Sequence, residues 1–146
     1  MLGDVCVGKT CIVNRYVSDS FSSTEATVVA GFSSKFLTVN PTDDPVPTKI
    51  KLQIWDTAGS EKFRSLSQIY YKKAAAVCLT YDVTSMASFE ALAHWVKELE
   101  DNTHQDIIKY VVGNKCDLNE DEEVNVKVAS NFAKNIGGSL FFVSAK

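Results

Sequence analysis

Three short apolar runs stand out in the hydrophobic pattern of the chain, at Ala75–Tyr81, Ile107–Val112 and Leu140–Val143. Each run is continuous, which is typical of strands that are buried on both faces of a parallel sheet. Two further segments, Ser33–Val39 and Ile50–Trp55, read as strands joined by "NPTDDPVPT". The three prolines of this connection predict a loop, so we expect the two strands to form a hairpin.

Helical patterns lie between the apolar runs. One helical pattern consists of Phe89, Leu92, Val96 and Leu99. A second consists of Val128, Ala129, Phe132, Ala133 and Ile136, and Gly137 and Gly138 end it as a helix C-cap. Strands that alternate with helices imply right-handed βαβ units, so we predict an α/β fold with a doubly wound parallel sheet. The acidic stretch "NEDEEV" (Asn119–Val124) is predicted to be a solvated loop.

Composition narrows the class of protein. The chain has 146 residues and a net charge of −3, which predicts a single domain, residues 1–146, without a general surface for nucleic acids. The four cysteines show no paired spacing, so we expect reduced thiols in a cytoplasmic protein. They are Cys6, Cys11, Cys78 and Cys116. The sequence contains no signal peptide and no apolar run long enough to span a membrane.

The stretch "GDVCVGKT" (Gly3–Thr10) carries the first recognisable chemistry. Its spacing, Gly, four residues, then Gly-Lys-Thr, is that of a loop whose backbone N–H groups and following helix bind phosphates. Lys9 is expected to reach the β- and γ-phosphates, and Thr10 to offer its hydroxyl to Mg²⁺. The loop does not select the base, because adenine-using kinases and ATPases share it.

Three later motifs contain residues that could bind the base, the metal and the γ-phosphate. In "NKCD" (Asn114–Asp117), a carboxylate at Asp117 can accept two parallel hydrogen bonds from guanine, which adenine cannot donate. "WDTAG" (Trp55–Gly59) places Asp56 at a strand end, where it can hold Mg²⁺ through a water molecule, and Gly59 can bring its N–H to the γ-phosphate. "SAK" (Ser144–Lys146) can direct backbone N–H groups at the guanine oxygen.

These four motifs, in this order, resemble those of small GTPases of the Ras superfamily. "KLQIWDTAG", "KFRSL", "YYKKA" and "LTYDVT" resemble the Rab branch, whose members direct vesicle-mediated transport of proteins. The resemblance implies a six-stranded sheet flanked by five helices, GTP and GDP as ligands, Mg²⁺ as cofactor, and hydrolysis of GTP. It also implies effectors, an exchange factor and a GTPase-activating protein as partners. Membrane attachment, at the cytoplasmic face of endomembranes, would need a lipidated tail that this chain lacks.

The family's site residues carry over by position. The phosphate loop corresponds to Gly3, Val5, Cys6, Val7, Gly8, Lys9 and Thr10. The base contacts correspond to Phe21, Asn114, Lys115, Asp117, Ser144, Ala145 and Lys146. Cys11 corresponds to a backbone contact with the α-phosphate, Thr27 to the switch I threonine that senses Mg²⁺ and the γ-phosphate, and residues 59–71 to switch II. Trp55, Phe63 and Tyr70 are similar to an aromatic patch that effectors recognise.

Two departures from the family concern hydrolysis. Ser60 occupies the position of the glutamine that orients the attacking water, and its hydroxyl is too short to reach that water. Val5 replaces a small residue and would crowd the γ-phosphate. We therefore predict slow hydrolysis and keep a second interpretation open, a GTP-locked or nucleotide-empty binding module that does not hydrolyse GTP. A nucleotide kinase is disfavoured, because the chain has no arginine-rich lid and "NKCD" fits guanine.

Two further departures concern the fold and switch I. The segment before Gly3 is too short for the family's first, central strand, and the chain stops before the family's last helix. We therefore expect a gap or an open strand edge at the centre of the sheet. Switch I reads "TVVAGF", with Val29 in place of a glycine.

Overall fold

A computed structural model describes residues 1–22, 26–27, 30–41, 46–59, 74–103 and 107–146. One half of the molecule is a parallel sheet in the order β3-β4-β5. The strands are β3 (Ala76–Asp82), β4 (Ile108–Asn114) and β5 (Ser139–Phe142). The register pairs Asp82 with Asn114, so the carboxyl ends of β3 and β4 lie together. These strands match the three apolar runs, shifted by one or two residues.

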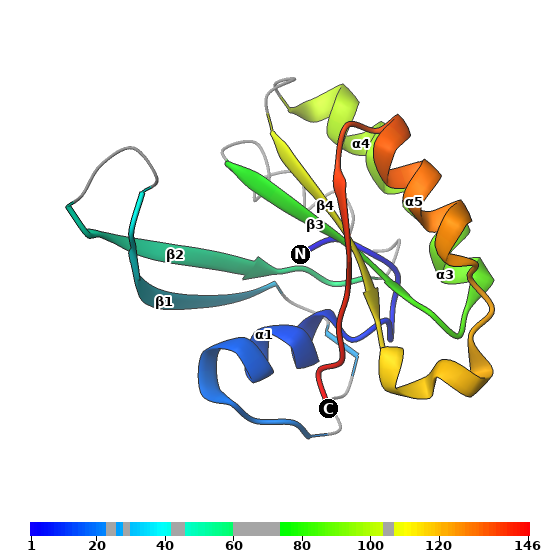
Figure 1. The fold of residues 1–146 in the computed structure, drawn as a ribbon, viewed down its shortest axis with the longest axis horizontal. Helices are drawn as coiled ribbons and strands as arrows, with labels where there is room; N and C mark the ends of the chain where they lie inside the picture. Colours follow the sequence, from blue (N-terminus) through cyan, green and yellow to red (C-terminus); the bar gives the residue numbers. More distant parts are fainter. Residues whose placement is uncertain (23–25, 28–29, 42–45, 60–73, 104–106) are drawn as a thin grey trace.

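Three helices lie together on one side of this sheet (Figure 1). They are α3 (Met86–Glu90), α4 (Leu92–Asn102) and α5 (Val126–Asn135). The main core lies between the helices and the sheet, with Leu79, Trp95 and Leu99 fully buried. The α/β prediction is thus confirmed. The helical pattern that begins at Phe89 is divided between α3 and α4, which meet at Ala91.

The other half consists of a hairpin and one helix. β1 (Gly31–Val39) pairs antiparallel with β2 (Thr48–Asp56), which confirms the predicted hairpin, and α1 (Lys9–Ser18) lies beside it (Figure 1). Most hairpin residues are exposed, and Asp56 at the end of β2 is the only strand residue there that is fully buried.

The two halves meet at Met1 and Leu2, which lie between β2 and β3. Leu2 N donates to Cys78 O at 2.8 Å, Thr80 N donates to Leu2 O at 2.7 Å, and the Met1 amino group donates to Trp55 O at 2.7 Å. In the described residues the strands form two separate sheets. Leu2 pairs with Leu79 of β3 in an isolated β-bridge, and the bond from Met1 to Trp55 O connects the same segment to β2. The expected gap at the centre of the sheet is therefore present, and an apolar cleft of about 890 Å³ opens there.

The acidic stretch departs from the predicted loop. Residues Cys116–Asp121 form a 3₁₀-helix, η2. Val124 is fully buried in the main hydrophobic core, and its N–H donates to Val83 O. Glu123 accepts a hydrogen bond from Met86 N at the start of α3. The prediction of a purely solvated loop is therefore wrong at its C-terminal end. Within the described ranges, the structure contains no helix that is long and apolar enough to cross a bilayer.

A candidate nucleotide-binding site

The loop Gly3–Gly8 turns back on itself directly before α1. Cys6 and Gly8 have φ values of 61° and 91°, in the left-handed region. A Cβ at Gly3 would lie 2.1 Å from Thr80 O, so only glycine lets the loop approach β3 this closely. Gly8 then serves as the N-cap of α1, whose first-turn N–H groups face the loop without a side-chain cap. This geometry provides an anion-binding helix N-terminus.

Lys9 lies across the loop rather than in solvent. Its side chain is buried, and Nζ donates to Gly3 O at 3.0 Å and to Asp4 O at 2.7 Å. Burial lowers the pKa of the Lys9 ammonium, although Asp56 and Asp4 oppose the shift. A phosphate placed at the loop would supply the negative charge that favours the protonated form.

Oxygen atoms converge beside the first turn of α1. Thr10 Oγ1 donates to Asp56 Oδ2 at 2.6 Å and lies 2.8 Å from Thr27 Oγ1. The second carboxylate oxygen, Asp56 Oδ1, is buried and has no hydrogen-bond partner in the described residues. A carboxylate and two hydroxyls are hard ligands that suit Mg²⁺, which keeps several of its waters. No group of three or more His, Cys, Asp or Glu side chains forms a metal site in the part of the chain that the structure describes.

The other end of the site lies where β4 and β5 end. Ser144 Oγ donates to Asp117 Oδ1 at 2.6 Å, and Lys146 N donates to Ser144 Oγ at 3.1 Å. Arg15 of α1 fixes this segment, because Nε donates to Ala145 O at 2.9 Å and Nη2 to Lys146 O at 2.8 Å. The Asp117 carboxylate is exposed at the rim, where it has lone pairs left for further donors.

Asn114 connects the two ends of the site. It is 1% exposed, and its Nδ2 donates to Val7 O at 2.8 Å, so the residue before "KCD" is bonded to the middle of the phosphate loop. Its Oδ1 is buried without a partner in the described residues. A Cβ at Gly8 would lie 2.3 Å from Asn114 Nδ2, which shows how closely the two segments pack.

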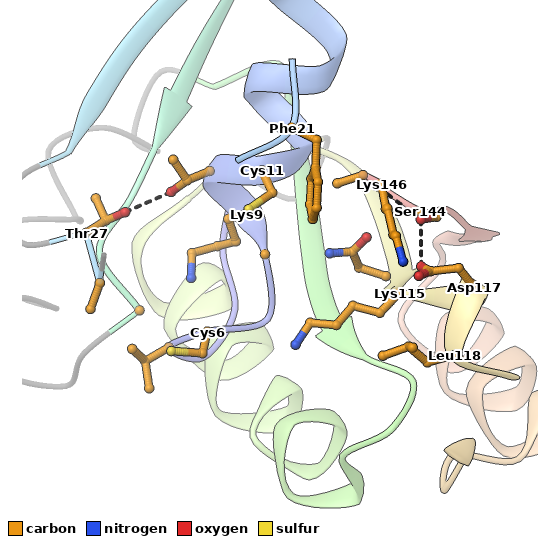
Figure 2. Close-up of a pocket in the computed structure, with 17 residues that line it drawn as sticks. Cys6, Lys9, Cys11, Phe21, Thr27, Lys115, Asp117, Leu118, Ser144 and Lys146 are labelled. Atoms are coloured by element: carbon orange, nitrogen blue, oxygen red, sulfur yellow. Dashed lines mark hydrogen bonds between the residues drawn. The ribbon is translucent and has the colours of Figure 1, made fainter. Parts of the chain in front are cut away.

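A single pocket of about 430 Å³ holds most of the predicted residues, and its lining is drawn in Figure 2. Its lining includes Val5, Cys6, Gly8, Lys9, Thr10, Cys11, Phe21, Thr27, Gly59, Asn114, Lys115, Asp117, Ser144, Ala145 and Lys146. Gly3 and Val7 do not line it; they form the back of the loop. Asp56 does not line the pocket either, but its carboxylate accepts a hydrogen bond from the pocket residue Thr10. Sequence reasoning missed Ala26 and Leu118, although Leu118 directly follows the base motif.

Several predicted residues cannot be placed. Ser60, Val29, Phe63 and Tyr70 lie outside the described residues. Trp55 lies on β2 and packs against Phe32 with ring centroids 4.8 Å apart. The aromatic patch therefore stays a prediction, with one of its three members placed.

Comparison with known proteins assigns the class. The family model described as "Ras family" matches residues 1–146. The chain is 38% identical over 146 residues to the dog (Canis lupus familiaris) Ras-related protein Rab-13, covering all of this chain and 70% of that protein. It is 40% identical to the rat (Rattus norvegicus) Ras-related protein Rab-31 over 148 aligned positions, covering all of this chain and 72% of that protein. The chain therefore belongs to the Ras family of small GTPases and is Rab-like.

The match with a third relative covers a smaller share of that relative. The "Ras-like GTP-binding protein RYL2" of Yarrowia lipolytica is 50% identical over 123 residues. This match covers 84% of the present chain and 56% of the yeast protein, so the chain spans little more than half of that relative.

Proposed function

We propose that the protein is a Rab-like switch in vesicle-mediated protein transport that binds GTP or GDP with Mg²⁺ and hydrolyses GTP slowly. The observation that carries this proposal is the bond between Asn114 and Val7. It joins a phosphate loop to a base-reading loop, and residues of both loops line one pocket of about 430 Å³. The family membership supports the same class of ligand.

Guanine recognition is assigned to Asp117. The carboxylate would accept hydrogen bonds from the N1–H and the 2-amino group of guanine, and the N–H groups of residues 144–146 would face the guanine oxygen. The bond from Ser144 and the two bonds from Arg15 fix this segment before a base arrives. Phe21, half exposed at the pocket, would cover one face of the base.

The metal end is assigned to Thr10, Thr27 and Asp56. Mg²⁺ held there would neutralise phosphate charge and orient the β- and γ-oxygens. Lys9 binds the same phosphates, and it is already placed over the loop by its bonds to two carbonyls. Gly59 packs against the loop, since a Cβ there would lie 2.5 Å from Asp4 O and Val5 N.

The switch follows from how the hairpin is attached. Thr27 precedes β1, and Asp56 ends β2. The side chains of both residues contact the Thr10 hydroxyl, so the segments that enter and leave the hairpin meet at Thr10. The γ-phosphate would order these ends, and effectors, an exchange factor and a GTPase-activating protein would distinguish the ordered form. Trp55, Phe63 and Tyr70 are the proposed contact patch. The proposed location is the cytoplasm, and the cytoplasmic face of endomembranes for a form with a lipidated tail.

Val5 favours a second candidate function. Its side chain is 45% exposed and lines the pocket where the γ-phosphate would lie. Together with Ser60 at the position of the water-orienting glutamine, it favours a module that binds nucleotide and effectors without hydrolysis.

The nucleotide carried by the purified protein tests the proposal. We expect near-stoichiometric GDP or GTP after denaturation and chromatography, and nucleotide exchange accelerated by chelation of Mg²⁺. Bound GTP that persists for days identifies the non-hydrolysing module. A protein that carries no nucleotide and does not bind added GDP with Mg²⁺ contradicts both of these nucleotide-binding functions and leaves only the nucleotide-empty module.

A further inference from the structure

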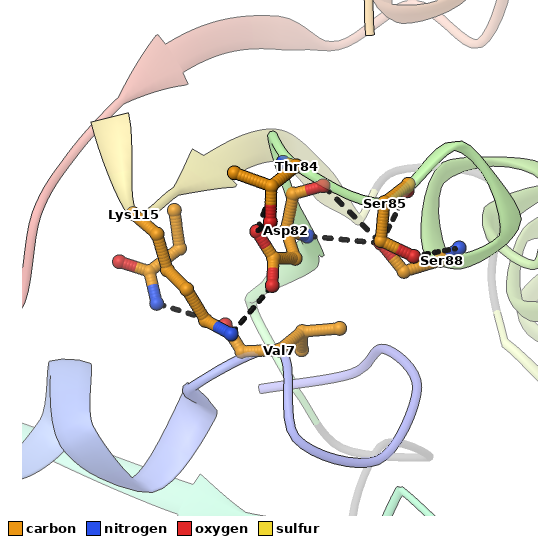
Figure 3. Close-up of polar contacts among 7 residues, drawn as sticks. Val7, Asp82, Thr84, Ser85, Ser88 and Lys115 are labelled. Carbon is orange, nitrogen blue, oxygen red and sulfur yellow. Dashed lines mark hydrogen bonds and ion pairs between the residues drawn. The ribbon is translucent and has the colours of Figure 1, made fainter. Parts of the chain in front are cut away.

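An ion pair lies behind the base-reading end of the pocket. Lys115 Nζ lies 2.5 Å from Asp82 Oδ2, and the two side chains are 34% and 11% exposed (Figure 3). Asp82 is the last residue of β3, and Lys115 follows the last residue of β4. The parallel register places these two strand ends side by side, which allows the pair to form.

Lys115 has an unusual backbone conformation at this point. Its φ is 65°, in the left-handed region that non-glycine residues seldom adopt. Such strain persists where the surroundings fix it, and it is concentrated at functional sites. Lys115 and Asp117 both line the pocket although the chain turns between them (Figure 2). The ion pair at Nζ fixes one end of the Lys115 stem, and the strained backbone fixes the other.

Asp82 is itself held by its own loop. Its Oδ1 accepts from Thr84 N at 3.0 Å and from Thr84 Oγ1 at 2.8 Å, and its backbone N donates to Ser88 Oγ at 3.0 Å. Burial alone would raise the pKa of the Asp82 carboxyl, but hydrogen bonds from Lys115 and Thr84 outweigh burial and hold that pKa below its usual value. The carboxylate therefore stays charged and fixed near neutral pH.

The Lys115 stem lies at the side of the pocket opposite Phe21. In Figure 2, Phe21 lies above the base end of the pocket, and Lys115 and Leu118 lie below it. A long aliphatic stem can form an apolar wall while its ammonium group stays bonded elsewhere. The wall exists only while Nζ is held at Asp82, because a free lysine side chain samples many rotamers.

We propose that Asp82 is a positioning residue for the nucleotide: by holding the Lys115 ammonium, it sets the lower wall of the base compartment. This inference rests on the proposed binding of guanine nucleotide. It predicts that loss of the Asp82 charge weakens contacts with the nucleoside and leaves contacts with the phosphates unchanged.

The test compares four single variants and one double variant of the full chain. Asp82→Asn removes the charge with little change of shape, and Asp82→Glu restores it. Thr84→Val is the matched control, since it removes one bond to Oδ1 and leaves the Lys115 pair intact. Lys115→Met keeps the stem without the ammonium group. GDP and pyrophosphate, each with Mg²⁺, compete with a fluorescent GDP analogue, and a melting curve checks the fold of each variant.

We expect Asp82→Asn to weaken GDP about fivefold, a modest factor because the pair is partly exposed. In Asp82→Asn the pyrophosphate affinity should change less than twofold. In Thr84→Val the GDP affinity should also change less than twofold, and Asp82→Glu should recover most of the GDP affinity. The double variant Asp82→Asn/Lys115→Met should be no weaker than Lys115→Met alone, because both changes act on one link.

Three results overturn the inference. The first is an unchanged GDP affinity in Asp82→Asn. The second is an equal loss of GDP affinity and pyrophosphate affinity in that variant. The third is a loss of GDP affinity in Thr84→Val as large as that in Asp82→Asn. Each of the last two indicates a merely structural role. If Asp82→Asn does not fold, a Lys115→Met variant that folds and keeps full GDP affinity overturns it equally. A wild-type chain that binds no GDP is a different result, because it rejects the proposed function itself.

Discussion

The base end and the metal end of the pocket are built in different ways. The base end rests on the carboxyl ends of β4 and β5, and Arg15 and Ser144 hold its loops by short hydrogen bonds. The metal end is assembled from α1 and the two ends of the hairpin, through Thr10, Thr27 and Asp56. One end is thus part of the packed half of the molecule, whereas the other depends on a hairpin that is mostly exposed.

We expect the two ends to have different roles, base selection at one end and response to the γ-phosphate at the other. A base site on a buried frame can select guanine identically in both nucleotide states. A metal site that includes the ends of an exposed hairpin can change with the γ-phosphate, because few buried contacts oppose movement of the hairpin. Asn114 lies between the two ends and ties them through Val7.

Replacing Asp117 should have the largest effect, and only at the base end. We expect Asp117→Ala to weaken GDP by about 100-fold, because a site built to pair a polar group on its ligand discriminates strongly by that pair. ADP affinity should not fall. Glu120→Ala, an exposed change in the same 3₁₀-helix, is the control and should have no effect. The measurement is equilibrium titration of both nucleotides with Mg²⁺, and equal losses for GDP and ADP would reject the assigned role.

A change at Gly8 should break the link between the ends. Gly8→Ala places a Cβ 2.3 Å from Asn114 Nδ2 at a φ of 91°, so it adds a clash to backbone strain. We expect about a tenfold loss of GDP affinity and a lower melting temperature, since a strained left-handed residue alone costs roughly 1 kcal/mol.

The control for Gly8 is Gly137→Ala. Gly137 has a φ of 68° with nothing within 4 Å of an added Cβ, so this variant carries the strain without the clash. It should lower the melting temperature and leave GDP affinity intact. If both variants behave alike, the packing of Asn114 on Gly8 does not matter for binding.

The metal end is distinguished by its dependence on the γ-phosphate. Thr10→Ala should weaken Mg²⁺-dependent GDP binding several-fold, by about 1 kcal/mol, whereas Thr27→Ala should have little effect in the GDP state. With a non-hydrolysable GTP analogue, both should weaken binding. Titration of Mg²⁺ at fixed nucleotide measures the two variants. An equal loss in GDP would show that Thr27 is not a switch residue.

The smallest effect is expected on hydrolysis. Ser60→Gln should raise single-turnover hydrolysis a few-fold, and Val5→Gly should raise it further in the same background, because positioning of water is a large part of catalysis in such sites. Unassisted hydrolysis in this class is already slow, on the order of 10⁻⁴ s⁻¹ in the Ras example. Rates that stay unchanged in both variants would mean that neither residue limits the reaction.

Local patterns located the strands well, because each apolar run forms a strand. The expected burial on both faces holds for most of β3 and for the C-terminal half of β4, but it is wrong for β5, where Phe141 is 51% exposed. The motifs also placed Lys9, Thr10 and Asn114 in one pocket, since parallel strands bring their carboxyl ends to one edge. Other features depend on residues that are distant in sequence. The Arg15 bonds to Ala145 and Lys146 and the Lys115–Asp82 pair arise only when the ends of α1, β3, β4 and β5 meet. No periodicity signals such contacts.

The acidic stretch illustrates the same limit. Its charges predicted solvation, and most of it is exposed, but the Val124 side chain is buried in the hydrophobic core and its N–H is bonded to Val83 O. One apolar residue in a charged run carried too little signal to predict that contact. The bond from Met86 N to Glu123 is likewise a tertiary contact.

The central claim is that this pocket selects guanine, and one calorimetric comparison of GDP, IDP and ADP with Mg²⁺ tests it most directly. IDP lacks the 2-amino group and keeps N1–H, so it offers Asp117 one donor instead of two. The account predicts the affinity order GDP, then IDP, then ADP, with the IDP deficit abolished in Asp117→Ala. Equal affinities for GDP and ADP in the wild-type chain would contradict it.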